Sequence, residues 1–446
     1  MSAWAAEGMV VGTERVVFLA ELGLDGRLRP VRGVLPAVAA AVRAGVETVV
    51  VSRENAHEAA LVPGVEVLTA SHAVEVAWAF SRGNRVRREV GDRFPDLDER
   101  MPDRHVGGAA SVEESRDAAP VPEAGGDLAE VRGQHEARFA LEVAAAGGHH
   151  LLLVGAPGAG KTMLAERLPG ILPPLGDDAA MEVTAIESVA GDAATVGRLR
   201  RRPPFEAPHH SASTAAVVGG GARIARPGAV TRAHCGVLFV DEAPEFQRRV
   251  LDSLRQPVET GVISLHRAAG SVTYPARFQL IMAANPCPCG MALGRAGECS
   301  CSVAQRRGYL AKLSGPLLDR IDLQVQVDRP RSASMTLDEP GESSAAVLDR
   351  VLAARAVQQD RLGRWELRMN SQAPMGLLTG ALRPASAATA ALDAALDRGG
   401  LSLRGYVRVL RLAWTLTDMA GRTSPEAEDV DAAMQLRQST EERRTG

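Results

Sequence analysis

One motif restricts the fold of this chain more than any other feature. Residues 155–162 read GAPGAGKT and match G-x-x-x-x-G-K-[ST], the pattern of a phosphate-binding loop, or P-loop. An apolar run at 151–154 precedes the motif and a helical pattern follows it, which is the context that the motif requires. The sequence therefore predicts an α/β domain built around a parallel sheet, with a nucleotide at the end of one strand.

The residue types of this loop suit the phosphates of ATP. Glycines allow backbone N–H groups to close around phosphate oxygens, Lys161 reaches the β- and γ-phosphates, and Thr162 can be a ligand of Mg²⁺. The only other lysine in the chain is Lys312, which is distant from the loop in sequence. We expect ATP to be bound by Gly155, Pro157, Gly158, Gly160, Lys161 and Thr162.

Two further strands are expected to bring polar groups to the same site. The run at 237–240 ends in Asp241 and Glu242, and the strand predicted at 279–283 is followed by Asn285. Ligands of open α/β sheets lie at the carboxyl ends of the strands. We expect Asp241 to hold Mg²⁺, Glu242 to activate water as the general base, and Asn285 to orient that water.

Four of the five cysteines gather between residues 287 and 301. They form two Cys-x-Cys pairs, Cys287 with Cys289 and Cys299 with Cys301, which together supply enough thiolates for one tetrahedral Zn²⁺. In a cytosolic chain, such clustering favours a metal over disulfides. Reduced thiols without a metal, or a redox or iron-sulfur role, are the alternatives, because Cys-x-Cys is tighter than the usual Cys-x-x-Cys spacing.

The chain reads as two folded parts joined by a linker. Residues 16–80 alternate short β-rich runs with helical patterns, so residues 1–81 are expected to form a small α/β unit. Residues 82–126 are charged and repeatedly interrupted by Pro, Gly and Asp, as in a flexible linker. Residues 127–330 hold the motifs described above, and residues 345–446 have a helical pattern throughout.

Composition and hydropathy exclude some locations and partners. No apolar stretch approaches the roughly 18 to 20 residues of a membrane span, and the N-terminus lacks the features of a signal peptide. We therefore expect a cytoplasmic protein without membrane contacts. The net charge of −3 gives no overall field that would attract nucleic acid, so a nucleic-acid site must be a local basic patch.

Taken together, the motifs resemble those of the AAA+ ATPases, and among them the magnesium-chelatase-like proteins of the YifB or ComM type. The resemblance covers residues 16–80 and 127–440, and its most specific strings are GAPGAGKT, PHHSAS, VLFVDEAPEF, NPCPCG and LSGPLLDRIDL. It implies a P-loop domain of the AAA+ type with a C-terminal helical lid. It also implies a hexameric ring that uses ATP and Mg²⁺.

The resemblance assigns roles to two arginines. Arg320, in LLDRID, resembles the arginine finger that is offered to the γ-phosphate of a neighbouring subunit, an effect worth about 10³ to 10⁵ in rate. Arg404, in SLRGYVRVLRLA, resembles the sensor 2 arginine of the lid, which would contact the phosphates of its own subunit. The structural alternative for Arg320 is an ion pair with Asp319 or Asp322.

The N-terminal part resembles the second half of the Lon-protease-like domain that precedes the ATPase in this family. The catalytic lysine of Lon proteases falls in the segment that matches residues 33–37, where this chain has no lysine. The sequence therefore predicts a non-catalytic, partial Lon-like unit, and not a protease. The missing first half indicates either a misplaced start codon or a truncated domain.

Two segments are candidates for contact with DNA. Residues 195–232 contain seven arginines against one acid, Glu206, and residues 262–274 have the pattern of a β-hairpin. A solvated arginine-rich face is the alternative, and the His209–His210 pair could instead be a metal or core site. The candidate contacts are Arg200, Arg201, Arg202, Arg223, Arg226, His266 and Arg267.

The resemblance implies a motor that couples ATP hydrolysis to DNA translocation or branch migration, as in natural transformation or recombination. A rival expectation is the ATPase subunit of a magnesium-chelatase-like complex that remodels a protein partner. A third is a scaffold that only binds nucleotide, which the intact Asp241–Glu242 pair disfavours.

Overall fold

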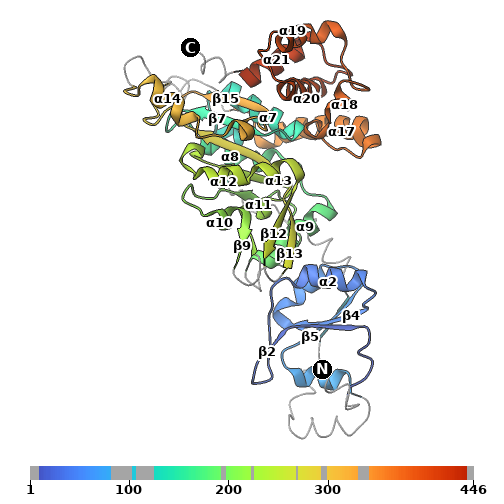
Figure 1. Cartoon of the computed structure of the whole chain (residues 1–446). Helices are drawn as coiled ribbons and strands as arrows, with labels where there is room; N and C mark the ends of the chain where they lie inside the picture. Colours follow the sequence, from blue (N-terminus) through green and yellow to red (C-terminus); the bar gives the residue numbers. More distant parts are fainter. Residues whose placement is uncertain are drawn as a thin grey trace. The chain divides into compact units, whose positions relative to one another are not determined.

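The computed structural model describes residues 10–81, 103–106, 125–191, 197–221, 226–267, 270–292, 299–329 and 341–438; for 103–106, 266, 267 and 438 it describes the backbone only. The chain forms two compact units (Figure 1). The first contains residues 1–121 and 175–201, and the second contains 122–174 and 202–446. Residues 175–201, which we expected inside the ATPase domain, therefore belong to the N-terminal unit.

The first unit is a small α/β fold. Its sheet has the order β1-β4-β5-β6, with three parallel strands and an antiparallel β6. The strands are β1 (Val16–Leu19), β4 (Thr48–Ser52), β5 (Glu66–Ala70) and β6 (Asp103–Val106), and a short hairpin joins β2 (Glu21–Leu22) to β3 (Leu28–Arg29). The helices are α2 (Val34–Arg43), α3 (Ala56–Ala60), α4 (Ala73–Ala79) and α9 (Asp177–Ala190).

Helix α9 completes the core of this unit, although it follows the P-loop in the sequence. Ala180 of α9 and Leu199 are buried in the same apolar cluster as Leu35 and Val38 of α2. The buried carboxylate of Glu58 accepts hydrogen bonds from the Leu35 N–H at 2.9 Å and from the Ser188 hydroxyl. An apolar face and a buried polar network thus hold the two chain segments together.

The second unit is built on a five-stranded parallel sheet with the order β15-β7-β14-β11-β8. These strands are β7 (Leu151–Gly155), β8 (Phe205–Glu206), β11 (Val237–Val240), β14 (Gln279–Ala284) and β15 (Leu323–Val327). Leu151 and Leu153 face one apolar cluster, and Leu152 and Val154 face another. Burial on both faces explains why these strands read as continuous apolar runs.

Helices cover both faces of this sheet, as predicted for an α/β domain with a helical C-terminus. One cluster joins the sheet to α7 (His135–Gly147), α8 (Lys161–Arg167) and the C-terminal helices α17 (Ser344–Leu362), α18 (Met375–Leu378), α19 (Ser386–Asp397), α20 (Leu403–Met419) and α21 (Ala427–Gln438). The other cluster involves α10 (Thr214–Val218), α11 (Ala229–Arg232), α12 (Arg248–Ser253) and α15 (Gly315–Leu318). Helices α13 (Arg255–Thr260) and α14 (Val303–Leu310) complete this unit.

Two antiparallel ribbons belong to the second unit. The hairpin expected at 262–274 is confirmed as β12 (Val262–Arg267) paired with β13 (Gly270–Pro275). A shorter ribbon pairs β9 (Gly219–Gly220) with β10 (Arg226–Pro227). Among the described residues, no helix combines the length and the apolar character that a membrane crossing requires.

A buried ionic network fixes the C-terminal helices to the end of the sheet where the strands begin. Asp322 directly precedes β15 and pairs with Arg408 of α20. The His149 ring, directly before β7, lies 3.6 Å from the Asp322 carboxylate and 2.8 Å from the Thr415 hydroxyl. Burial by itself would raise the pKa of Asp322, but Arg408 and His149 hold it well below its usual value.

Candidate nucleotide-binding site

The P-loop lies between β7 and α8, and its glycines are required by its geometry. Gly158 and Gly160 have φ angles of 74° and 90°, a region that favours residues without a Cβ atom. A Cβ atom on Gly155 would lie 2.3 Å from the carbonyl oxygen of Val327 on the neighbouring strand. The glycines thus allow the backbone to turn tightly and leave its N–H groups open to an anion.

Lys161 points into the loop and links it to the adjacent strand. Its ammonium group donates to the carbonyl oxygens of Gly155 at 2.7 Å and Ala156 at 3.1 Å, and to Asn285 Oδ1 at 3.1 Å. Burial lowers the pKa of Lys161, while the carboxylates of Asp241 and Glu242 raise it. Lys161 and Asn285, predicted separately from two strands, therefore meet at one point.

Thr162 and Asp241 are also brought together. The Thr162 hydroxyl donates to Asp241 Oδ2 at 2.7 Å, and the backbone N–H of Glu242 donates to Asp241 Oδ1 at 2.8 Å. A hydroxyl and a carboxylate this close are hard oxygen donors of the kind that Mg²⁺ prefers alongside nucleotide phosphates. The expected pair of Mg²⁺ ligands fits this chemistry.

Glu242 has an unusual backbone and an unexpected partner. Its φ of 49° and ψ of 43° place a non-glycine residue in the left-handed region, a conformation that costs about 1 to 3 kcal/mol. Its Oε2 lies 3.3 Å from Nδ1 of His210, which follows β8 in the same sheet. His210 was not among the predicted site residues, because its contact with Glu242 joins the segments that follow two different strands.

The two predicted arginines lie at the opposite end of the strands from the P-loop. Arg320 pairs with Glu259 and donates to the Pro316 carbonyl, and Arg404 lies 3.8 Å from Asp319. Hydrogen bonding and charge from Arg320, with a further contribution from Arg404, lower the pKa of Glu259. The two arginines therefore both lie near Glu259.

This placement corrects the expectation that Arg404 contacts the phosphates of its own subunit. β15 and β7 are parallel, with Leu323 opposite Leu151 and Val327 opposite Gly155. Arg320 and Arg404 lie where these strands begin, whereas the P-loop lies where they end, about 16 Å away for five residues at about 3.3 Å each. The Asp322–Arg408 pair fixes the lid there.

The four clustered cysteines converge in space. The Sγ atoms of Cys287, Cys289 and Cys299 are 3.3 to 3.7 Å apart, and all four candidate ligand atoms, including that of Cys301, lie within 4.8 Å of one another. All four thiols are free of disulfides.

Most candidate DNA contacts either form ion pairs within the protein or have side chains outside the described residues. Arg200 pairs with Glu187 and Arg201 with Asp177, all in the first unit. Arg202 is half-buried and Arg226 is exposed on β10. Arg223 and the side chains of His266 and Arg267 lie outside the described residues, although the backbone places 266 and 267 at the tip of the β12–β13 hairpin.

Two P-loop supports had no recognisable sequence signal. Gln134, at the start of α7, donates to the Ala159 carbonyl at 2.5 Å. Arg329, two residues after β15, donates to the Pro157 carbonyl at 3.1 and 3.3 Å. Both contacts join segments that are far apart in the sequence.

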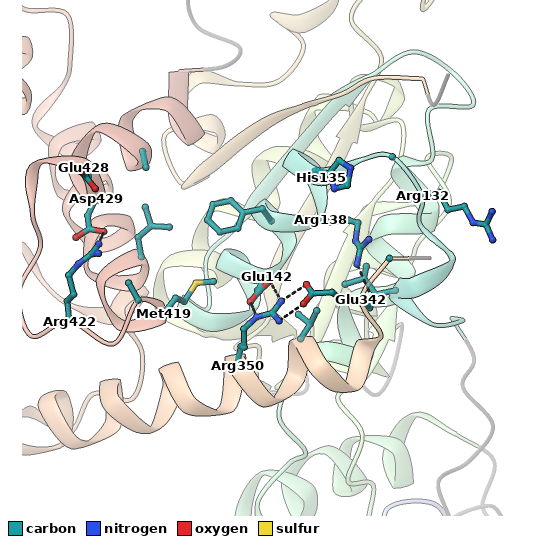
Figure 2. Close-up of a pocket in the computed structure, with 18 residues that line it drawn as sticks. Arg132, His135, Arg138, Glu142, Glu342, Arg350, Met419, Arg422, Glu428 and Asp429 are labelled. Carbon is teal, nitrogen blue, oxygen red and sulfur yellow. Dashed lines mark hydrogen bonds and ion pairs between the residues drawn. The ribbon is translucent and has the colours of Figure 1, made fainter. Parts of the chain in front are cut away.

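A cavity of about 920 Å³ lies between α7, the start of α17, and helices α20 and α21 (Figure 2). Arg350 is held there between the carboxylates of Glu142 and Glu342, at 2.7 to 2.9 Å (Figure 2). P-loop residues do not line this cavity, so it is separate from the phosphate site.

Comparison with known proteins gives consistent matches. Residues 127–335 match the family described as magnesium chelatase, subunit ChlI, residues 341–437 match its C-terminal family, and residues 3–55 match the family described as subunit ChlI of Mg-chelatase. An uncharacterized protein of Mycobacterium tuberculosis is 49% identical over 96% of this chain and 79% of its own length.

Two further relatives have names. The uncharacterized protein YifB of Escherichia coli is 39% identical over 90% of this chain and 72% of its own length. The competence protein ComM of Haemophilus influenzae is 38% identical over 91% of this chain and 74% of its own length.

Proposed function

The chain belongs to the magnesium-chelatase-like family of AAA+ ATPases that includes YifB and ComM, and from this membership we propose that it is a ring-forming motor that couples ATP hydrolysis to movement along DNA. We propose hexameric rings in the cytoplasm that perform translocation or branch migration. The observation that carries the ATPase part is the convergence of Lys161, Thr162, Asp241 and Glu242 at the ends of β7 and β11, the two strands that flank β14.

The residues divide the work of hydrolysis. P-loop N–H groups and Lys161 bind the phosphates, and Thr162 with Asp241 would hold Mg²⁺, which neutralises developing charge on the phosphate oxygens. Glu242 accepts the proton of the attacking water, and His210 orients its carboxylate. Asn285 links Lys161 to the adjacent strand and can hydrogen-bond the same water.

Arg320 and Arg404 complete the site of a neighbouring subunit. Both lie where the strands begin, at the opposite end from their own P-loop. Both contact acidic side chains, and an anionic γ-phosphate can take the place of these partners. A finger supplied in this way requires subunits arranged head to tail, and such contacts close into a ring.

Support for a DNA partner comes from the two antiparallel ribbons, each of which has exposed residues. Gly270, Ser271, Val272 and Thr273 of β13 are exposed, and the hairpin ends in a basic residue, Arg267. Arg226 on the β9–β10 ribbon is also exposed. Basic residues on such ribbons suit contacts with phosphates that do not depend on base sequence.

The first test measures ATP turnover with and without single-stranded DNA, duplex DNA and a four-way junction. We expect stimulation by DNA, loss of nucleotide binding in Lys161→Ala, and retained binding without hydrolysis in Glu242→Gln. The ATPase assignment fails if Lys161→Ala hydrolyses ATP normally, and the DNA assignment fails if no DNA binds at low salt.

The second test concerns the ribbons. Removing the charges with Arg226→Ala and Arg267→Ala should lower the slope of log affinity against log salt by about 0.7 to 0.9 per lost phosphate contact. Arg398→Ala, an exposed arginine on the lid, is the matched control. Unchanged slopes in both ribbon variants would contradict these contacts.

The alternative is an ATPase that remodels a protein partner, as a magnesium-chelatase-like complex does. It is favoured by the family match over 127–335 and by the magnesium-chelatase 38 kDa subunit of Acidiphilium rubrum, which is 27% identical over 203 residues. ATP turnover that no DNA stimulates, together with intact rings, would favour this alternative.

A further inference from the structure

The sulfur atoms of the cysteine cluster have the spacing of a metal site. Cys287 Sγ lies 3.3 Å from Cys289 Sγ and 3.7 Å from Cys299 Sγ, and Cys289 and Cys299 are 3.6 Å apart. Four sulfurs at about 2.3 Å from a tetrahedral Zn²⁺ are about 3.8 Å from one another. The three distances among Cys287, Cys289 and Cys299 therefore differ by about 0.5 Å or less from those around such an ion, and Cys301 lies within 4.8 Å of the other three.

We infer that Cys287, Cys289, Cys299 and Cys301 bind one Zn²⁺, and that this site holds the P-loop in its nucleotide-binding shape. Thiolates are soft ligands that select Zn²⁺ over Mg²⁺, and four protein ligands leave no open position for catalysis. The ion is therefore structural. The second half of the inference rests on the proposed ATPase function, whereas the first half does not.

The first connection from the cluster to the P-loop is a direct backbone contact. Gly290 follows the second cysteine and has a φ of 77°. A Cβ atom at this position would lie 2.4 Å from Cδ of Pro157, in the P-loop. The turn that carries Cys287 and Cys289 thus packs against the P-loop with no room for a side chain.

The second connection passes through Arg329. Its guanidinium donates to the Pro157 carbonyl at 3.1 and 3.3 Å and lies 3.7 Å from the Met291 sulfur. Because Met291 follows Gly290, this side chain joins the cysteine turn to the P-loop a second time.

The third connection involves the strand and helix on either side of the cluster. Asn285, two residues before Cys287, accepts a hydrogen bond from Lys161. On the other side, Ser302 follows Cys301 and caps α14 through a reciprocal pair of hydrogen bonds with Gln305. Helix α14 carries Tyr309, which interacts with Glu245 and Asn285. An ion that ties the two cysteine pairs together would therefore fix the sensor strand, the P-loop and α14 at once.

The metal is tested on the full chain, purified without chelators and under reducing conditions. We expect about one zinc per chain by elemental mass spectrometry, and loss of that zinc in the Cys299→Ser, Cys301→Ser double variant. Cys235→Ser keeps all four clustered cysteines and should keep the zinc, so loss of zinc in this variant would contradict the inference. A wild-type chain that contains no zinc, and takes up none from added Zn²⁺, overturns the inference, as does iron in its place.

The connection to the P-loop is tested by nucleotide affinity. Stripping zinc with a thiol reagent and a chelator should weaken binding of a fluorescent ATP analogue by at least about tenfold, with recovery after reduction and return of Zn²⁺. Gly290→Ala keeps all four cysteines, but its added methyl group collides with Pro157. This variant should retain zinc and bind the nucleotide more weakly than the wild type does. Unchanged affinity in both the stripped protein and Gly290→Ala overturns the connection.

Failure of the proposed function would look different. Lys161→Ala should lose nucleotide and keep its zinc, since Lys161 does not belong to the cluster. If the wild-type chain holds zinc but binds no ATP, the ATPase proposal fails and the metal site stands.

Discussion

Glu242 is held from two directions, by its own backbone and by a side chain from another strand. Its backbone is in the left-handed region, and Nδ1 of His210 lies 3.3 Å from its carboxylate. The adjacent His209 ring lies against His210 at an interplanar angle of 34°, with 4.1 Å between ring centroids. A general base whose position is constrained before substrate binds has less reorganisation to undergo during the reaction.

We predict that His210→Ala lowers ATP turnover while nucleotide affinity stays near its wild-type value, because His210 contacts the base and not the P-loop. The loss should be smaller than the roughly 10² to 10⁴-fold of losing the base itself. His210→Asn, which keeps a donor near the Nδ1 position, should recover part of the rate. Equal rates for wild type and His210→Ala in steady-state assays would remove His210 from the mechanism.

Sequence was sufficient for residues whose role is encoded by a local motif. Lys161, Thr162 and Asp241 are recognisable because each type stands at a fixed distance from a strand end, and the structure brings them together. His210 and Arg329 act through contacts between distant segments. No local spacing records such contacts, so they become visible only when the sheet order is known.

The junction between the sheet and α20 contains a buried histidine, His150. Beside the Asp322–Arg408 pair, Nδ1 of His150 accepts a hydrogen bond from the Leu280 N–H at 2.9 Å. Nδ1 must therefore carry no proton. Burial lowers the pKa of His150 from 6.5 to about 4, although the nearby Asp322 opposes this shift. Protonation therefore breaks a backbone contact at the start of β7.

We predict that the second unit loses stability as the pH falls from about 6.5 to about 4. In this window the unfolded chain binds a proton at His150 that the folded chain refuses, and the full difference corresponds to about 3 kcal/mol. The stability from this group is fully present above pH 6.5. Thermal unfolding of wild type and His150→Asn between pH 7.5 and 4.5 checks it: the variant should show a flatter profile, and parallel profiles would refute the assignment.

The helical lid shows what periodicity can and cannot predict. The helical pattern after residue 345 is confirmed, with α17 beginning at Ser344. The lid docks where the strands begin because Asp322 and Arg408 form a buried pair there. These two residues are 86 positions apart in the sequence. A sequence pattern gives no means of pairing them, which is why Arg404 was expected at the wrong end of the strands.

The arrangement of Arg320 and Arg404 predicts how mixed rings behave. A subunit with Lys161→Ala has no working P-loop but still offers both arginines to its neighbour. Mixing it with Arg320→Ala subunits, or separately with Arg404→Ala subunits, should restore part of the ATP turnover that each variant lacks alone. If Arg404 acted within its own subunit, only the Arg320→Ala mixture would recover. Turnover across mixing ratios, with mixed rings confirmed by mass, separates the two cases.

The exchange of residues 175–201 between units could not be seen in the sequence. The face of α9 that is buried, including Ala180, Val183 and Ile186, has the same helical spacing as a helix that packs on its own domain. We predict that a chain beginning at residue 122 leaves this face without its partner, α2. Hydrogen exchange should then be fast at 177–190 and remain slow in β7 and β14, and equal protection of 177–190 in both chains would contradict this division.

The interrupted first unit also has a consequence for biosynthesis. Its core requires Leu199, so this unit cannot finish folding when residue 81 is made, but must wait for a further 120 residues that include the P-loop. At about 5 to 20 residues per second, the delay on the ribosome is about 6 to 24 s. During that time α9 does not yet cover the apolar side of α2. The nascent N-terminal segment is then exposed to chaperones that bind apolar segments.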